Sequence, residues 1–220
     1  MSFGFGVCRE PSIELEGENN MSISVPPSNM HQHLHNVLQS GEGADISFKV
    51  KGETFPAHRI ILASRSSVFR AELFGSMSES TASCIEIEDM EPQIFKALLQ
   101  FIYTDMFPPS DDHTDEGVEL DGDIMAQHLI VAADRYALDR LRLICEETLA
   151  KKINADNVVT TLALAAQHNC QQLKELCLDY ISSSKILDSL IETDVFESFL
   201  VSCPSIYKQL LKKVASNRRT

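Results

Sequence analysis

The side chains best suited to chemistry are histidines, and they occur in two settings. Three of them, His31, His33 and His35, alternate with other residues in the sequence HQHLH. The surrounding apolar spacing predicts a helix, on which these imidazoles point in different directions, so we interpret them as solvent-facing residues rather than ligands of one metal ion. His58 comes directly after an expected strand. There we expect a hydrogen-bonded structural residue, with Asp45 as a candidate partner, rather than a general base.

Cysteines are the next candidates for chemistry. No two of them have the C-x-x-C spacing of a zinc knuckle or a thioredoxin-type site. Because they are widely spread and four lie in helix-like apolar patterns, we expect buried free thiols in a reducing compartment. The six are Cys8, Cys84, Cys145, Cys170, Cys177 and Cys203.

The sequence also lacks the short motifs of common enzyme classes. It contains no GxGxxG, no phosphate-binding loop, no HExxH and no GxSxG. No local pattern assembles a nucleophile with a base and an orienting group. We therefore predict that the protein is not an enzyme and that it uses neither a metal nor a cofactor.

The charge of the chain argues against nucleic acid as a partner. The 220 residues carry a formal net charge of −13 at pH 7, and the isoelectric point is near 4.9, which suits phosphate backbones poorly. Residues 105–123 hold eight acidic side chains without any Lys or Arg. We interpret this segment as a solvated loop between helices, and docking of a basic partner is the alternative. Lys212, Lys213, Arg218 and Arg219 suit a helix end, and a nuclear address is the alternative.

No membrane or secretory segment is visible. The longest uncharged apolar runs fall well short of the roughly 20 residues that a membrane span needs. The N-terminal residues MSFGFGVCRE lack a basic stretch followed by an apolar one. We therefore expect neither a signal peptide nor a membrane partner.

The first half of the chain alternates between strand and helix patterns. Met21, Ile23 and Val25 fit a short strand that Pro26 and Pro27 end. Ser28 is the expected cap of a helix that carries Met30, Leu34, Val37 and Leu38 and ends at Gly41. The further expected elements are a hairpin of strands 45–50 and 53–57, short helices 59–65 and 67–74, a strand 84–88, and a helix starting at Pro92.

The second half contains only helix patterns. Helices are expected over 124–137, 139–152, 156–168, 171–183, 192–202 and 205–216, with Asp139 as a cap and Pro204 as a separator. Since strands concentrate before residue 90 and helices after it, the fold class is α+β, a small three-stranded sheet with helices followed by an all-helical extension.

Several runs together resemble the BTB/POZ domain. They are GADISFKVKGETFPAHRIILASRSSVFRAELFG at 43–75, Ile85 to Pro92, Phe95 to Thr104, Ala132 to Leu138, and Leu141 to Glu146. The resemblance is strongest to plant-like MATH–BTB proteins, which share the Val-Pro-Pro-Ser entry at 25–28 and an acidic insert after Phe-Ile-Tyr-Thr-Asp. It implies the end of a MATH domain with its linker at 1–28, a BTB/POZ domain at 29–152, a BACK-like helical extension at 153–216, and a tail at 217–220.

The resemblance also implies which residues meet partners. BTB domains dimerise through the first helix, here Met30, Leu34 and Val37, with Ile61 on the partner face. The hydrophobic-x-Glu motif of cullin-3 adaptors is matched by Met77, Ser78 and Glu79, and Phe69 is a further candidate whose alternative is core packing. Leu210 and Leu211 on the last helix are candidates for a second oligomer contact, with bundle core as the alternative.

The function implied is that of a dimeric substrate adaptor of a cullin-3 RING E3 ubiquitin ligase. Its partners would be the cullin-3 N-terminal domain, itself or a related MATH–BTB protein, and a substrate that the sequence does not identify. The alternative is a regulatory BTB protein that pairs with full-length adaptors, because about 25 residues before the BTB entry cannot form an eight-stranded MATH sandwich. Either the product is shortened or its start is missing. A transcriptional repressor of this family would need a DNA-binding module, and the sequence has no zinc-finger spacing. Since family members occur in the nucleus and the cytoplasm, we expect one or both of these locations.

Overall fold

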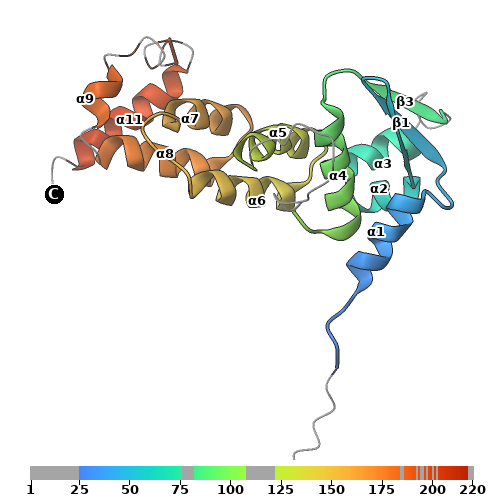
Figure 1. Cartoon of the computed structure of the whole chain (residues 1–220). Coiled ribbons are helices and arrows are strands. Elements are labelled where there is room, and N and C mark those ends of the chain that lie inside the picture. Colours follow the sequence, from blue (N-terminus) through green and yellow to red (C-terminus); the bar gives the residue numbers. More distant parts are fainter. Residues whose placement is uncertain are drawn as a thin grey trace, which may run out of the picture.

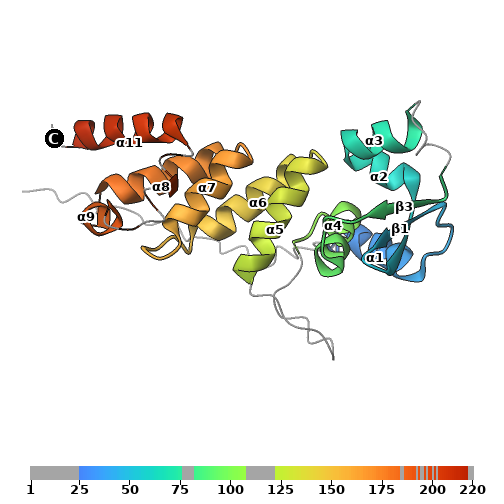
Figure 2. The same cartoon turned by 90° about the horizontal axis from the view of Figure 1, so that it is seen from above.

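The molecule is elongated, with a small sheet at one end and a helical bundle at the other. The computed structural model describes residues 25–75, 82–107, 122–183, 186–191, 193, 196, 198, 199, 201 and 203–217. In chain order the elements are α1 (Met30–Ser40), β1 (Ile46–Val50), β2 (Glu53–Ala57), α2 (Arg59–Arg65), α3 (Ser67–Phe74), β3 (Cys84–Ile87), α4 (Pro92–Thr104), α5 (Gly122–Arg135), α6 (Asp139–Ala150), α7 (Val158–Gln167), α8 (Gln171–Ser183), α9 (Ile186–Ile191) and α11 (Pro204–Asn217). Helices α5 and α6 lie between the two ends (Figure 1), and the view from above shows the same order (Figure 2).

The sheet has the order β2-β1-β3, with β1 antiparallel to β2 and parallel to β3. Lys51 and Gly52 both have positive φ, 45° and 94°, which is what a two-residue hairpin requires. Ser47 donates its N–H to the carbonyl of Ser83 at 3.0 Å, so this residue faces β3 and not β2. Its partner across the hairpin is Pro56, whose nitrogen therefore points away from β1.

Helix α1 lies at the edge of the sheet end and ends as the sequence predicts. Gly41 has a φ of 64° and donates its N–H to the carbonyl of Val37 at 3.1 Å, which is a left-handed helix end that glycine favours. Ser28 accepts a 3.4 Å hydrogen bond from the N–H of Met30, so it contributes at the helix start while Asn29 occupies the cap position.

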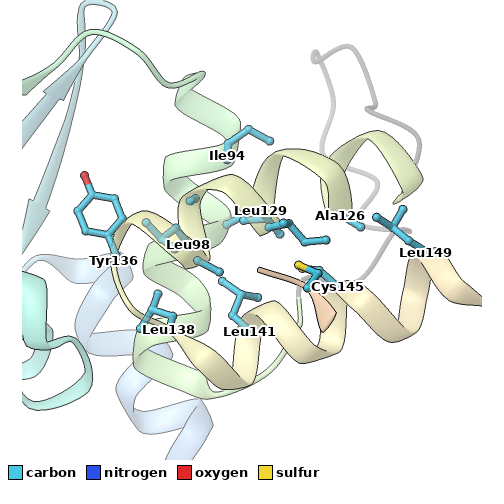
Figure 3. Packing of buried hydrophobic residues seen from close by; sticks show 14 of the residues in the cluster. Ile94, Leu98, Ala126, Leu129, Tyr136, Leu138, Leu141, Cys145 and Leu149 are labelled. Carbon is cyan, nitrogen blue, oxygen red and sulfur yellow. The ribbon is translucent and has the colours of Figure 1, made fainter. Parts of the chain in front are cut away.

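The core is continuous from one end of the molecule to the other. Helix α4 begins with Pro92 and buries eight residues, and Figure 3 shows Leu98 of α4 in one cluster with Leu129 of α5 and Leu141 of α6. A single set of contacting buried side chains runs from Ile46 in β1 to residues of α11. The sheet end and the helical end thus share one hydrophobic core rather than two.

Most predicted elements are confirmed, and three details differ besides the cap of α1. Asp139 is the first residue of α6, and the cap position belongs to Leu138, which provides no side-chain bond. The break before the last helix lies at residue 203, and Pro204 is itself the first residue of α11, where its missing N–H has no intrahelical partner to lose. Helix α9 was not predicted. Residues 1–24, 108–121 and 218–220, which include parts of the predicted first strand, the acidic segment and the basic cluster, lie outside the described residues.

Candidate protein-interaction site

The face of α1 that was predicted to meet a second chain is incompletely covered by its own chain. None of the residues of α1 is buried, and the side chain of Met30 is 61% exposed. Met30 and Leu34 line a hollow of about 460 Å³ together with Ile61 of α2. Val37 is partly buried against the core and is not among the lining residues. Three of the four residues predicted for a dimer contact therefore surround one concave surface.

The end of α4 closes this hollow and contains a hydrogen-bonded tyrosine. The hydroxyl of Tyr103 accepts the N–H of His58 at 2.9 Å and lies 2.8 Å from Nδ1 of the same residue. Nε2 of His58 lies 2.8 Å from the carbonyl oxygen of Glu42, so Nε2 carries the proton and Nδ1 accepts from the phenol. Burial raises the pKa of Tyr103 to about 12. The phenol therefore keeps its proton, and His58 is structural, as predicted.

The predicted partner of His58 was wrong. Oδ1 of Asp45 accepts the backbone N–H of Arg59 at 2.8 Å. This N–H is in the first turn of α2, where such groups have no intrahelical acceptor, and the positive end of the helix favours a carboxylate. Both nitrogens of His58 are already satisfied by Tyr103 and Glu42, so the carboxylate is used at the helix start instead.

Charged side chains line the rim of the hollow. Asp105 ends α4 in a left-handed conformation with a φ of 58°. Its Oδ2 accepts from Nε of Arg140 at 2.8 Å, and its Oδ1 accepts from Nη2 of Arg65. The guanidinium of Arg65 also lies 5.9 Å from the ring centre of Phe101. An apolar centre with a polar rim is the usual anatomy of a protein interface.

The histidines of α1 have separate surroundings. His33 lies within 3.2 Å of the side-chain nitrogen of Asn29, and His31 lines the hollow. Within the residues that the structure describes, no group of three His, Cys, Asp or Glu side chains is placed to hold a metal ion. In the same part of the chain, no helix has both the length and the apolar character of a bilayer span.

Phe69 belongs to the core, so its prediction as a partner contact was wrong. Its side chain is 0% exposed, stacks on Tyr136 with ring centres 4.3 Å apart, and meets the edge of Phe48 at 5.7 Å. Ser66 accepts the backbone N–H of Phe69 at 3.1 Å and donates to the carbonyl of Tyr136 at 2.6 Å. The alternative of core packing is what the structure shows.

The motif residues Met77, Ser78 and Glu79 lie outside the described residues, but the chain on both sides of them is described. Arg59 donates from Nη1 to the carbonyl of Leu73 at 3.1 Å and from Nη2 to the carbonyl of Ala82. One guanidinium thus ties the end of α3 to the residues before β3.

An exposed aromatic side chain next to this segment was not predicted. Phe74, the last residue of α3, is 56% exposed. The apolar pattern of α3 places four large side chains within eight residues, and the sequence does not reveal which of them the core leaves uncovered.

The two leucines of α11 that were candidates for a second contact differ in burial. Leu210 is 4% exposed and belongs to the bundle core, whereas Leu211 is 50% exposed. For Leu210 the alternative of bundle core is what the structure shows, and Leu211 is the one of the two on the surface. A second hollow, of about 660 Å³, lies between α7 and the start of α11.

The cysteines with described environments differ in burial. Cys145, Cys170 and Cys177 are buried, Cys203 is partly buried, and Cys84 is exposed. Burial raises the pKa of Cys145 to about 12. All five are free thiols, so the expectation of burial was wrong for Cys84, which lies on an outer strand of the sheet.

Two families of domains match the chain in sequence. The BTB/POZ domain matches residues 34–153, and the BACK domain of the BPM/SPOP type matches residues 157–211. The solved BTB domain of zebrafish PATZ1 matches with 22% identity and a TM-score of 0.44, over 59% of this chain and 99% of that one.

Relatives from Arabidopsis thaliana are similar over most of the chain. The BTB/POZ and MATH domain-containing protein 3 is 45% identical over 202 residues, which cover 92% of this chain and 50% of that protein. The BTB/POZ and MATH domain-containing protein 4 is 40% identical over 206 residues, which cover 92% of this chain and 44% of that protein. The chain therefore spans about half the length of these relatives.

Proposed function

Because the chain belongs to the BTB/POZ family and carries a BACK domain of the BPM/SPOP type, we propose that it is an adaptor subunit of a cullin-3 RING E3 ubiquitin ligase. The observation that carries this proposal is the succession of the two domains, at 34–153 and 157–211, on one continuous core. The adaptor role fits the absence of enzyme motifs in the sequence, because such a subunit does no bond chemistry itself. Its contribution is to hold a substrate at high effective concentration near the ubiquitin-loaded enzyme.

The proposed arrangement is a symmetric dimer through the α1 hollow. Met30, Leu34 and Ile61 present incompletely covered apolar surface there, and a two-fold contact would bury the same surface of both chains. The cullin would be contacted through Met77 and Glu79. The bonds of Arg59 to both flanks of that segment support the proposal because they hold its ends together. We place the complex in the nucleus or the cytoplasm.

A second candidate function is pairing with longer relatives of the MATH–BTB type, which would modulate ligation. Helix α1 contains no Asp, Glu, Lys or Arg. Charge on this helix therefore does not discriminate between a second copy and a relative, since such discrimination needs like charges to repel the wrong partner. Mixing the purified chain with a MATH-containing relative and measuring the mixed dimer by native mass spectrometry tests this candidate.

The test of the first proposal is calorimetric titration of the full chain with the cullin-3 N-terminal domain. We expect a Kd of about 1 μM or tighter, which corresponds to about −8 kcal/mol. The double variant Met77→Ala, Glu79→Ala should bind at least about tenfold more weakly, since an interfacial anchor is typically worth more than about 1.4 kcal/mol.

A matched control makes the same two changes elsewhere on the surface. Met106 is 53% exposed, and the side chain of Glu86 is 61% exposed in an ion pair with Lys49. Met106→Ala with Glu86→Ala should bind as the wild type does. Absence of binding by the wild type, or equal binding by both double variants, would refute the proposed contact.

A further inference from the structure

Two polar contacts hold the turn between α7 and α8 against the BTB part of the molecule. Nδ1 of His168, in this turn, lies 3.0 Å from Oδ2 of Asp134 on α5. On the other side of the turn, Oε2 of Glu146 on α6 accepts the backbone N–H of Leu173 at 3.2 Å. The residues come from the two matched domains, so these contacts cross the junction between them.

Glu146 is buried and is held by an ion pair within α6. Only 4% of Glu146 is exposed, and its Oε1 accepts from Nη1 of Arg142 at 2.8 Å. Leu173 is in the first turn of α8, where backbone N–H groups have no partner within the helix. The carboxylate thus caps the N-terminus of α8 from outside the helix, where the helix dipole is positive. The same Nη1 lies 3.5 Å from the carbonyl of Asn169.

The turn itself has a fixed shape. Asn169 has a φ of 56°, and Cys170 donates its N–H to the carbonyl of Ala165 at 2.9 Å, which is a standard left-handed helix end. The side chain of Cys170 is completely buried. Burial, and after it the nearby Glu146, raises the pKa of Cys170 to about 12.

Apolar packing alone does not specify one orientation of two helix pairs. Leu141 on α6 and Leu173 on α8 are both fully buried, but apolar contacts are non-directional and tolerate small rotations. Hydrogen bonds to a fixed carboxylate have directions and lengths that only one arrangement satisfies. The ion pair of Glu146 with Arg142 lies within α6, so it holds the carboxylate in place, and the hydrogen bond to Leu173 is what joins the two parts.

We infer that Asp134 and Glu146 are positioning residues that fix the α7–α8 pair relative to the BTB part of the chain. As far as it concerns the cullin, the inference rests on the proposed function: a partner that touches both parts would meet a preformed surface and would not have to order the junction on binding. The test is therefore built from two measurements, of which only one involves the cullin.

The first measurement is the distance between spin labels on the two parts of the full chain. Labels at Lys96 on α4 and Lys208 on α11, both exposed, are introduced as cysteines with Cys8, Cys84 and Cys203 replaced by serine. The buried thiols stay unlabelled. In Asp134→Ala with Glu146→Leu, the distance distribution should broaden and shift relative to the wild type. A distribution that stays as narrow as that of the wild type would overturn the inference.

The second measurement is cullin affinity at a temperature where circular dichroism shows every variant folded. The same double variant should bind about tenfold more weakly, because binding must then order the junction. Glu146→Gln keeps an acceptor for the N–H of Leu173 and should recover part of the loss. If the double variant proves unstable, Glu146→Gln alone still tests the inference through the width of its distance distribution.

The matched control is Asp156→Ala with Glu147→Leu. Glu147 neighbours Glu146 but pairs with Lys151 at the surface, and Asp156 is exposed. The control should match the wild type in both measurements. If the wild type fails to bind the cullin while the distance distribution of the variant broadens, the positioning role stands and the proposed ligase function fails.

Discussion

Helices α1 and α4 both carry an apolar stripe, but the rest of the chain fully covers only the stripe of α4. All of the apolar residues from Ile94 to Leu99 in α4 are buried, whereas none of the residues in α1 is. Leu34 and Val37 are only partly covered, and Met30 projects into solvent. Apolar residues at helical spacing are thus buried in α4 and partly exposed in α1. Such spacing indicates that one face of a helix is apolar, but it does not indicate what covers that face.

The difference separates residues that stabilise the fold from residues that are available to a partner. A buried apolar side chain in α4 is in contact with neighbours on all sides, and its loss leaves a cavity. Removing an incompletely buried side chain from α1 should cost the single chain little stability. It becomes important only when a second surface covers it.

The largest effect is expected from charging the α1 face. Leu34→Asp with Val37→Asp should convert the proposed dimer to monomers. At about 2 kcal/mol for each anchor, counted twice over in a symmetric contact, the loss is about 8 kcal/mol, or about a million-fold in Kd. Light scattering over a concentration series measures it.

The control adds the same charges, at the same spacing, on the opposite face of the same helix. Asn36 and Gln39 are exposed, so Asn36→Asp with Gln39→Asp should remain dimeric. If both double variants were dimers, the α1 face would not be the contact. If the first variant unfolded instead, the comparison between α1 and α4 would fail, because α1 would then be required for the fold.

A smaller effect, on stability rather than assembly, is expected in α4. Leu98 is 0% exposed, so Leu98→Ala should lower the free energy of unfolding by about 2–5 kcal/mol. Leu143 on α6 is 44% exposed, and Leu143→Ala should change the same quantity by less than about 1 kcal/mol. Urea denaturation of both variants at equal protein concentration makes the comparison, and similar losses would contradict the assignment of Leu98 to the core.

The smallest effect is expected in the reactivity of cysteine thiols at pH 8. It extends the contrast between buried and exposed side chains to the thiols. Burial raises the pKa of Cys145 and of Cys177 to about 12 from an ordinary value of 9.0, so almost none of these two thiols is ionised in the folded protein. Exposed Cys84 should react with iodoacetamide in the folded chain, whereas the buried thiols react only after unfolding. Peptide mass spectrometry after timed labelling measures the order of reaction.

The same shifts fix the direction of a pH dependence. Unfolded thiols release protons above pH 9, and the folded ones only near pH 12. The unfolded state therefore binds fewer protons between these values, and the stability that is fully present below pH 9 should be lost progressively toward pH 12. Thermal unfolding midpoints that rise across this range would contradict the burial of these thiols.

Local signals allowed the elements to be predicted, and distant contacts explain the errors. The hairpin around Lys51 and Gly52 and the start of α4 at Pro92 depend on neighbouring residues, which the sequence displays. The bond between His58 and Tyr103 spans 45 positions, and only folding shows that the pair meets. Phe69 and Phe74 have the same chemistry on one short helix, so their opposite burial depends on Tyr136, which is far away in the sequence.

The outer strand β2 has a consequence for behaviour at high concentration. An outer strand with free N–H groups invites strands of other molecules to add to it, which begins aggregation. The nitrogen of Pro56, the fourth of the five residues of β2, faces outward and carries no hydrogen. A foreign strand that arrived at this edge would lack the hydrogen bond that an N–H at Pro56 would donate, so this side of the sheet resists fibril-like growth.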